Sequence, residues 1–325
     1  MDPGHPYSQY LNHKDPEAPL LMEAEYYNLG NNIGTLSNHP LPDMMDYLLW
    51  SLDGLGYKYR LRQTSEVGAH DKGINRLEQI FMASEKMINR ARSFCVNFMV
   101  LFDDTFRTNS LNLPLVYLVG LNNKRRAFTV AMSFTRSEST TAFTFVLDCL
   151  DQVVFYQEEG QRNKSHPKVL ISDQTPELRK AILEHPSGRW NTIIHQLCQY
   201  HMYQDIRAFI QNNRQTRNTA EELNNVFRAI LNVIRCSRVN DLDEKRLDMY
   251  QLMEPEERKY YEYNWRAERK EERVLEAYVR GYPNRGCVGI FGDERRQKYM
   301  KRFLDNLSQT FNDSIQSLQR IRRNL

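Results

Sequence analysis

The spacing of hydrophobic and polar positions changes several times along the chain. Three apolar runs, rich in β-branched and aromatic residues, follow one another at 96–102, 113–121 and 126–134. Each run is typical of a β-strand. The short polar segment Asn-Asn-Lys-Arg separates the last two runs, so we expect three consecutive strands that form a meander.

The next part of the chain alternates between helical and strand patterns. The pattern predicts helices over 137–157, 176–184 and 201–211, and strands over 168–172 and 191–197. Strands that are joined through helices cross over and lie parallel, whereas the three first strands are antiparallel. The order βββαβαβα therefore predicts an α/β fold with a ribonuclease-H-like mixed sheet.

The patterns on either side of this region predict four further segments. Residues 1–42 are rich in Pro, Asn, His and Gly without periodicity, whereas 44–55 and 73–94 have the spacing of amphipathic helices. After residue 215 all patterns are helical. We therefore expect a flexible arm (1–42), a helical lead-in (43–95), the ribonuclease-H-like core (96–214), a large α-helical insertion (215–285) and C-terminal helices that complete the core (286–325).

Composition limits the class of protein. The 325 residues are 41% hydrophobic, which is enough for a real core. No apolar run is long enough to span a membrane, and the first residues lack the layout of a signal peptide, so we expect a soluble intracellular protein. The five cysteines are scattered, which argues against a disulfide framework or a four-cysteine zinc module.

Net charge is only +3, but its distribution is uneven. Residues 295–325 contain eight Lys or Arg and two acidic residues. A solvated helix face is the simpler interpretation of such a run, and a nucleic-acid-binding surface is the alternative.

Two aspartates follow apolar strands that should be neighbours in the sheet. Asp103 ends the first strand, and Asp173 ends the fourth. Acids at the carboxyl ends of adjacent parallel strands meet at one edge and repel each other unless a cation compensates them. Carboxylates are ligands of Mg²⁺, so we predict a Mg²⁺ or Mn²⁺ site there. For either aspartate alone, a strand end or a helix N-cap is the simpler interpretation.

Two nearby acids are assigned structural roles. Asp104 should face the other side of the sheet because side chains alternate along a strand. Glu138 lies at a predicted helix start, where a carboxylate complements the helix dipole.

Two blocks of residues resemble the core of Mutator-like element transposases, over roughly residues 45–305. The first block contains Asp103, Thr105, Phe106, Thr108, Asn109, Pro114 and Leu115, and the second contains Asp173, Leu178, Ala181, Ile182, Pro186, Cys198 and His201. The resemblance implies a ribonuclease-H-like core with an Asp-Asp-Glu triad and a helical insertion ahead of the helix that supplies the Glu.

Glu294 in GCVGIFGDERRQKYMKRFL is the residue that matches the family's Glu, although the Thr-Asn part of the family pattern is missing. Glu272 and Glu276 remain alternatives. The resemblance thus implies that Asp103, Asp173 and Glu294 bind two Mg²⁺ or Mn²⁺ ions and are catalytic in DNA cleavage and strand transfer.

Cys198 and His201 have the spacing of metal ligands. Two ligands do not complete a tetrahedral zinc site, so a buried thiol and a histidine at a helix start is the simpler interpretation, with a metal or DNA role as the alternative.

We expect DNA as a partner, a nuclear location and the possibility of a homo-oligomer. The DNA-binding candidates, chosen from charge alone, are Lys124, Arg125, Arg126, Arg295, Arg296, Lys298 and Lys301. The zinc-binding DNA-recognition modules of relatives have no counterpart here, so we expect either a shortened or decayed transposase or a transposase-derived domain whose partner supplies DNA recognition.

The leading hypothesis is therefore a metal-dependent transposase of the DDE type. The second is a catalytically decayed, transposase-derived DNA-binding regulator, similar to the far-red-response transcription factors of plants. The third is an α-helical interaction protein in which the sheet is only a scaffold.

Overall fold

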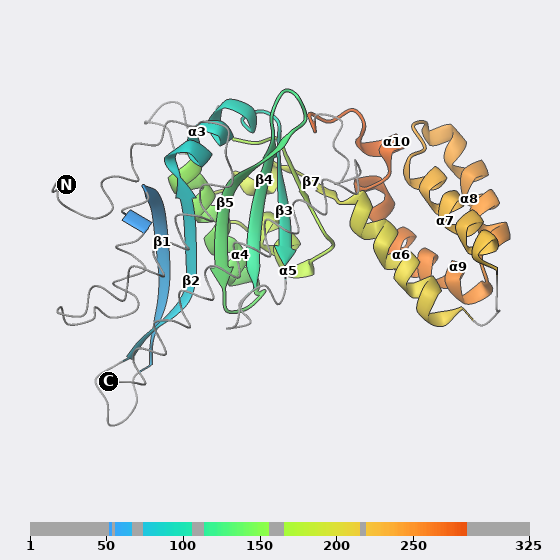
Figure 1. Ribbon diagram of the computed structural model, residues 1–325, viewed down its shortest axis with the longest axis horizontal. Coiled ribbons are helices and arrows are strands. Elements are labelled where there is room, and N and C mark those ends of the chain that lie inside the picture. The colour runs from blue at the N-terminus through green and yellow to red at the C-terminus, as the bar shows by residue number, and fades with distance from the viewer. Residues whose placement is uncertain are drawn as a thin grey trace, which may run out of the picture. The chain divides into compact units, whose positions relative to one another are not determined.

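The computed structural model describes residues 52–53, 56–66, 74–105, 114–155, 166–214 and 219–284 (Figure 1). The chain divides into two units, and residues 56–284 of the described part all belong to the unit made of Leu55–Thr105 and Pro114–Asp293. The predicted arm (1–42), most of the helix predicted over 44–55 and the predicted C-terminal helices (286–325) lie outside the described residues. Within those ranges, no helix has the length and apolar character needed to cross a membrane.

One seven-stranded mixed sheet organises the first part of this unit. Its strands are β1 (Tyr57–Glu66), β2 (Ile74–Ser84), β3 (Met99–Thr105), β4 (Leu115–Leu121), β5 (Ala127–Thr135), β6 (Val169–Ser172) and β7 (Ile194–Leu197). Their order in the sheet is β1-β2-β5-β4-β3-β6-β7. Neighbouring strands in the series β1-β2-β5-β4-β3 are antiparallel. Strands β6 and β7 continue the sheet and are parallel to β3. The predicted α/β class and the meander of β3, β4 and β5 are confirmed.

Strand β3 lies between β4 and β6. Leu101 pairs with Val119 of β4 on one side and with Ile171 of β6 on the other. Successive side chains alternate between the two faces, so β3 directs Val100 and Phe102 to one face and Leu101 and Asp103 to the other.

Three helices cover one face of the sheet. They are α3 (Glu85–Phe94), α4 (Thr140–Cys149), which continues into the π-helix η2 (Leu150–Val154), and α5 (Pro176–Leu183). Val100 and Phe102 belong to one buried cluster with Ile88 of α3, Phe143 of α4 and Leu178 of α5. The β3 face that carries Val100 and Phe102 is therefore the face of the helices, and Asp103 points away from them.

The second part of the unit is helical. Its main helices are α6 (Gln199–Asn213), α7 (Ala220–Ile234), α8 (Leu242–Leu252), α9 (Pro255–Tyr261) and α10 (Glu276–Val279). They share a second buried cluster, which contains Trp265 and Tyr261. Helix α7 begins at a capping box formed by Thr219 and Glu222, as its sequence favours. The helical character predicted after residue 215 is confirmed for residues 219–284.

The helix predicted over 73–94 is wrong in its first half. The structure has strand β2 at Ile74–Ser84, which pairs with β1 and β5, and only Glu85–Phe94 is helical. The apolar residues Ile80, Phe81 and Met82 fit a helix face and also a strand buried on both faces, and sheet pairing decides between the two. The predicted helical lead-in (43–95) thus contains two strands that join the sheet.

The helix predicted over 137–157 also differs in detail. Its N-cap is Ser139, whose side chain accepts a hydrogen bond from the Ala142 N–H, rather than residue 137. The helix ends in the wider turn of η2, which is followed by Phe155.

Candidate carboxylate site

Asp103 lies in β3, and Asp173 is the first residue after the adjacent parallel strand β6. Leu101 of β3 pairs with Ile171 of β6, and each aspartate comes two residues after its member of this pair. Because side chains alternate, both aspartates are directed to the sheet face opposite α3, α4 and α5. The structure therefore brings the two sequence-predicted aspartates together at one edge of the sheet.

The environment of Asp103 disfavours its charged form. The side chain is 17% exposed, and burial, together with repulsion by Asp173, raises the pKa of its carboxyl group. The positive charge of His201 acts in the opposite direction. The aspartates are thus close enough to repel each other, which is the condition that a bound cation relieves.

His201 is the cationic residue of the site. It lies in the first turn of α6, and its Nε2 is 3.8 Å from Oδ1 of Asp103. Burial lowers the pKa of His201, but the interaction with the Cys198 side chain and the charges of Asp103 and Asp173 outweigh burial and raise the pKa to about 9. Cys198 itself is a buried free cysteine. At neutral pH, therefore, His201 carries a positive charge next to Asp103.

A third carboxylate that the sequence analysis missed belongs to the same environment. Asp205 lies four residues after His201 in α6, so both residues share one helix face. Gln174, next to Asp173, donates a hydrogen bond from Nε2 to Oδ2 of Asp205 at 3.1 Å. Burial raises the pKa of Asp205, the Gln174 hydrogen bond and His201 lower it, and Asp173 raises it. The spacing His-x-x-x-Asp in a predicted helix was the sequence signal that could have indicated that Asp205 lies on the same helix face as His201.

Glu138 is a fourth acid close to this group. Burial raises its pKa, and repulsion by Asp173 and Glu177 adds to the effect. It precedes the N-cap Ser139, so it lies just outside the helix start at which we expected it. The side chain of Asp104 lies outside the described part.

Asp173 is oriented by its own turn. The Thr175 hydroxyl donates a hydrogen bond to Oδ1 of Asp173, and Thr175, not Asp173, is the N-cap residue of α5. The alternative interpretation of Asp173 as a helix N-cap is therefore wrong. Its carboxylate retains lone pairs for another ligand.

Other sequence-predicted residues lie elsewhere. Lys124, Arg125 and Arg126 are exposed in the turn between β4 and β5. Asp103 pairs with Tyr117, and β4 continues to Leu121, so the turn begins roughly 13 Å along the strand from the Asp103 pair, at about 3.3 Å per residue. The structure does not bring this turn to the aspartates.

The predicted third ligand Glu294 lies outside the described residues, as do Arg295, Arg296, Lys298 and Lys301. Of the two alternatives, Glu272 forms an ion pair with Arg269 at 2.6 Å, and Glu276 is the first residue of α10.

The donor chemistry of this site fits a hard cation. In the described ranges, no group of three or more His, Cys, Asp or Glu residues is arranged to hold a metal ion. Mg²⁺, however, commonly uses one or two carboxylates and keeps several waters. The convergence of Asp103 and Asp173 meets that requirement.

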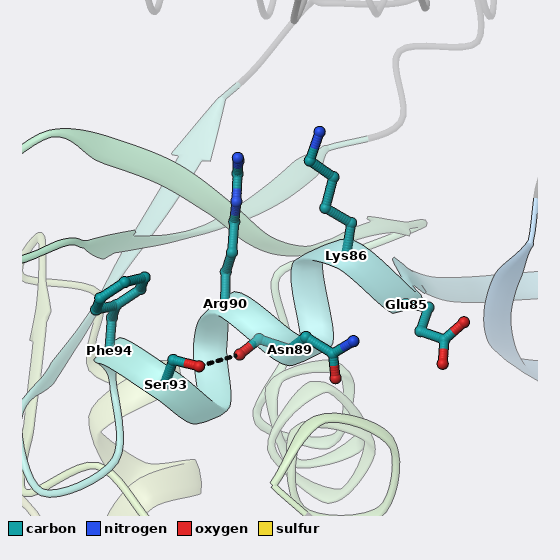
Figure 2. Close-up of a pocket in the computed structure, with 6 residues that line it drawn as sticks. All are labelled: Glu85, Lys86, Asn89, Arg90, Ser93 and Phe94. Carbon is teal, nitrogen blue, oxygen red and sulfur yellow. Dashed lines mark hydrogen bonds between the residues drawn. The ribbon is translucent and has the colours of Figure 1, made fainter. Parts of the chain in front are cut away.

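A surface hollow on α3 is separate from this site. Figure 2 shows its lining residues, which are Glu85, Lys86, Asn89, Arg90, Ser93 and Phe94. The side chains of Lys86 and Arg90 project in the same direction from the helix. Because α3 covers the sheet face opposite the one to which Asp103 points, this hollow does not contribute to the carboxylate site.

Comparison with known proteins shows a likeness to one protein family over part of the chain. A family model described as the MULE transposase domain matches residues 99–205. The match begins at the first residue of β3 and ends at Asp205, so it contains every residue of the carboxylate group described above. No curated protein matches the chain. Residues 99–205 are therefore similar to the transposase domain of Mutator-like elements (MULE).

Proposed function

We propose that this protein is a metal-dependent DNA transposase with a ribonuclease-H-like core, which cleaves DNA and transfers the cut strand. The observation that carries this proposal is the convergence of Asp103 and Asp173 on adjacent parallel strands inside the matched domain. The mutual repulsion of their carboxylates supports a cation as their ligand.

Asp103 and Asp173 would hold Mg²⁺ or Mn²⁺, and a third carboxylate would come from Asp205 or Glu294. A pair of such ions, when bound, activates the attacking water or 3′-hydroxyl and stabilises the leaving oxygen of a phosphodiester. Thr175 fixes the carboxylate of Asp173, and Gln174 fixes that of Asp205. His201, which is charged at neutral pH, is suited to donate a hydrogen bond to a phosphate oxygen beside Asp103.

Calorimetry of Mn²⁺ binding to the purified chain tests this proposal. We expect Asp103→Asn and Asp173→Asn each to weaken Mn²⁺ binding at least about tenfold, since each removes a charged ligand. Asp248→Asn is the matched control, because Asp248 is an exposed aspartate on α8. The same variants are assayed for nicking of supercoiled plasmid DNA in Mn²⁺. If the parent protein binds no Mn²⁺, or if the control weakens binding equally, the proposed metal site is wrong.

A catalytically decayed, DNA-binding regulator remains the second candidate. Two observations favour it. The charged His201 already lies next to Asp103 and compensates its negative charge. In the described residues, no three His, Cys, Asp or Glu side chains are arranged to hold a metal ion. If the protein is such a regulator, it should bind DNA in EDTA and should not nick plasmid DNA when metal is added. If it is a transposase, it should nick plasmid DNA in Mn²⁺, and Asp103→Asn and Asp173→Asn should each abolish the nicking. Either candidate would act in the nucleus. A separate protein would supply recognition of the DNA sequence, and the chain could form a homo-oligomer.

A further inference from the structure

Strands β1 and β2 form an arm that extends beyond the rest of the sheet. Strand β5 pairs with β2 over Gln79–Met82, whereas β1 and β2 continue together through four further pairs, up to Glu66 and Ile74. At about 3.3 Å per residue, this two-stranded segment is roughly 13 Å long. Figure 1 shows the paired ends of β1 and β2 beyond the arrowhead of β3. We call these two strands the β1–β2 arm.

The arm projects from the same end of the sheet as the carboxylates. Strands β1, β5 and β3 run in one direction, because neighbours in the series β1-β2-β5-β4-β3 are antiparallel. The residues paired across the sheet at the level of Asp103 lead to Tyr59 of β1. Beyond Tyr59, β1 continues for seven residues to Glu66, in the direction in which β3 ends. The paired residues at this level are Asp103, Tyr117, Met132, Met82 and Tyr59.

Three basic side chains alternate along the outer strand of the arm. Lys58, Arg60 and Arg62, which we call the basic row, are two residues apart and therefore share one face of β1. Arg60 pairs with Phe81, which belongs to the buried cluster of α3 and α4, so the basic row is on the helix-covered face. Lys58 and Arg60 are exposed, and Arg62 is partly exposed. Because β1 is the outermost strand, the row is accessible from the edge of the sheet.

The charges of the basic row are not balanced within the arm. Tyr57–Arg62 contains no acidic residue, and the residues of β2 that pair with the row are uncharged. Glu78 of β2 is already paired with Arg136 at 2.8 Å. Within the part of the chain that the structure describes, the row forms no ion pair or side-chain hydrogen bond. Cations roughly 6.6 Å apart along a strand repel one another, and an anion relieves this repulsion.

These features match the backbone of a nucleic acid. A chain of phosphates can contact several aligned cations at once, and an arginine guanidinium donates to two phosphate oxygens. The major groove of B-DNA also admits a two-stranded β-ribbon. Charges on an edge strand have a simpler role as well, which is to prevent pairing with another chain. That role does not account for an arm that projects from the carboxylate end of the sheet.

We infer that the basic row binds backbone phosphates of double-stranded DNA, with the β1–β2 arm lying along the duplex. That the polyanion is DNA rests on the proposed function, whereas the position of the cations rests on strand register. The row and Asp103 are on opposite faces and four strand spacings apart, which is roughly 19 Å at about 4.8 Å each. The row therefore holds a part of the DNA other than the phosphodiester at the carboxylates.

DNA binding without divalent metal tests the basic row. Fluorescence anisotropy of a labelled duplex of arbitrary sequence is measured over a NaCl series in EDTA. Each of Lys58→Gln, Arg60→Gln and Arg62→Gln should reduce the slope of log K against log salt by about 0.9, and the triple variant should reduce it by about 2.7. The matched control removes one lysine and two arginines that are exposed in the helical part, and it should keep the parent's slope. Its substitutions are Arg228→Gln, Lys259→Gln and Arg280→Gln.

The outcomes separate the basic row from its alternatives. An unchanged slope in the triple variant, an equal change in the control, or a parent that does not bind DNA would overturn the inference. Sedimentation velocity of the triple variant tests edge protection: self-association together with the parent's slope would show that the row only prevents strand pairing. If the triple variant does not fold, the three single variants decide the result.

The same assay distinguishes this inference from the proposed function. Because EDTA is present, a reduced slope supports the basic row even in a protein that neither binds Mn²⁺ nor nicks plasmid DNA. Conversely, a parent that nicks plasmid DNA in Mn²⁺ and a triple variant with the parent's slope would overturn the row and leave the proposed chemistry intact.

Discussion

His201 Nε2 lies 3.8 Å from Oδ1 of Asp103, and this contact joins the first turn of α6 to the central strand β3. The positive charge of His201 lowers the pKa of Asp103, against burial and Asp173, which raise it. We expect His201→Gln to raise the pKa of Asp103 in the metal-free protein, because the opposing charge is lost. Carbon-detected NMR titration of the aspartate carboxyl groups measures this, with Asp103→Asn to assign the resonance. A carboxyl that titrates at the same pH in both proteins would contradict the contact.

Asp205 should influence metal binding through the carboxylate group. We expect Asp205→Asn to weaken Mn²⁺ binding about tenfold, as loss of a ligand or of a residue that orients ligands typically does. Gln174→Ala should give a smaller loss, since it removes only the hydrogen bond to Asp205. Calorimetry of these variants beside Glu294→Gln identifies which acid is the third ligand. If Asp205→Asn binds Mn²⁺ like the parent, Asp205 has no part in the site.

His195 predicts a pH-dependent contribution to stability. Its pKa is about 3 in the folded protein, chiefly through burial, whereas an unfolded histidine has a pKa of about 6.5. Between these values the unfolded state binds a proton that the folded state does not. This contribution is therefore complete above pH 6.5 and is lost as the pH falls toward 3, with a slope of at most about 1.4 kcal/mol per pH unit.

Urea unfolding of the parent and of His195→Gln between pH 7 and pH 4 checks this prediction. We expect the difference in unfolding free energy between the two proteins to shrink as the pH falls. A difference that stays constant over this range would exclude a neutral, buried His195.

A buried ion pair stabilises the helical part. Arg246 Nη2 is 2.6 Å from Glu271 Oε2, the two side chains are 9% and 7% exposed, and the Tyr261 hydroxyl donates to Glu271 Oε1. We expect Glu271→Gln to lower the free energy of unfolding by about 3 kcal/mol, because it removes the buried charged partner of Arg246 and leaves its ion pair with the exposed Asp243. The double variant Arg246→Met with Glu271→Leu should be less destabilised, which urea titration measures. If the double variant loses as much unfolding free energy as Arg246→Met and Glu271→Leu lose together as single variants, this account is wrong.

Gly120 of β4 is required for close packing. A Cβ atom there would lie 2.5 Å from the Cys95 Sγ and 2.5 Å from the Phe128 ring, so a neighbour must shift. We expect Gly120→Ala to cost about 1–3 kcal/mol of stability, as overpacking of a core does. Gly281→Ala is the matched control, because nothing lies within 4 Å of its added Cβ. Thermal unfolding compares the two, and an equal change in both would rule out the steric explanation.

The strand-end aspartates could be predicted because two rules agree on them. Apolar runs predicted β3 and β6, and the order of elements made these strands neighbours, so Asp103 and Asp173 had to meet. Strand β1 could also have been found, since Tyr57, Tyr59 and Leu61 alternate with polar residues.

Other features depend on tertiary packing, which no local pattern contains. The direction of α6 places His201 and Asp205 beside β3, and that direction follows from burial of Met202, Ile206 and Ile210 in the helical core. Charge alone selected Lys124, Arg125 and Arg126, but only strand register shows that their turn is at the far end of β4.

Helix α6 is anchored at both ends. At its start, the Cys198 N–H bonds to the Ser172 carbonyl, and toward its end Phe209 stacks on Tyr260 of α9 with ring centroids 3.9 Å apart. A helix of this length spans about 22 Å at 1.5 Å per residue, so α6 connects the end of β6 to the helical core. The contact between Phe209 and Tyr260 in the helical core thus helps to set where His201 and Asp205 lie, so the position of the carboxylate group depends on packing outside the sheet.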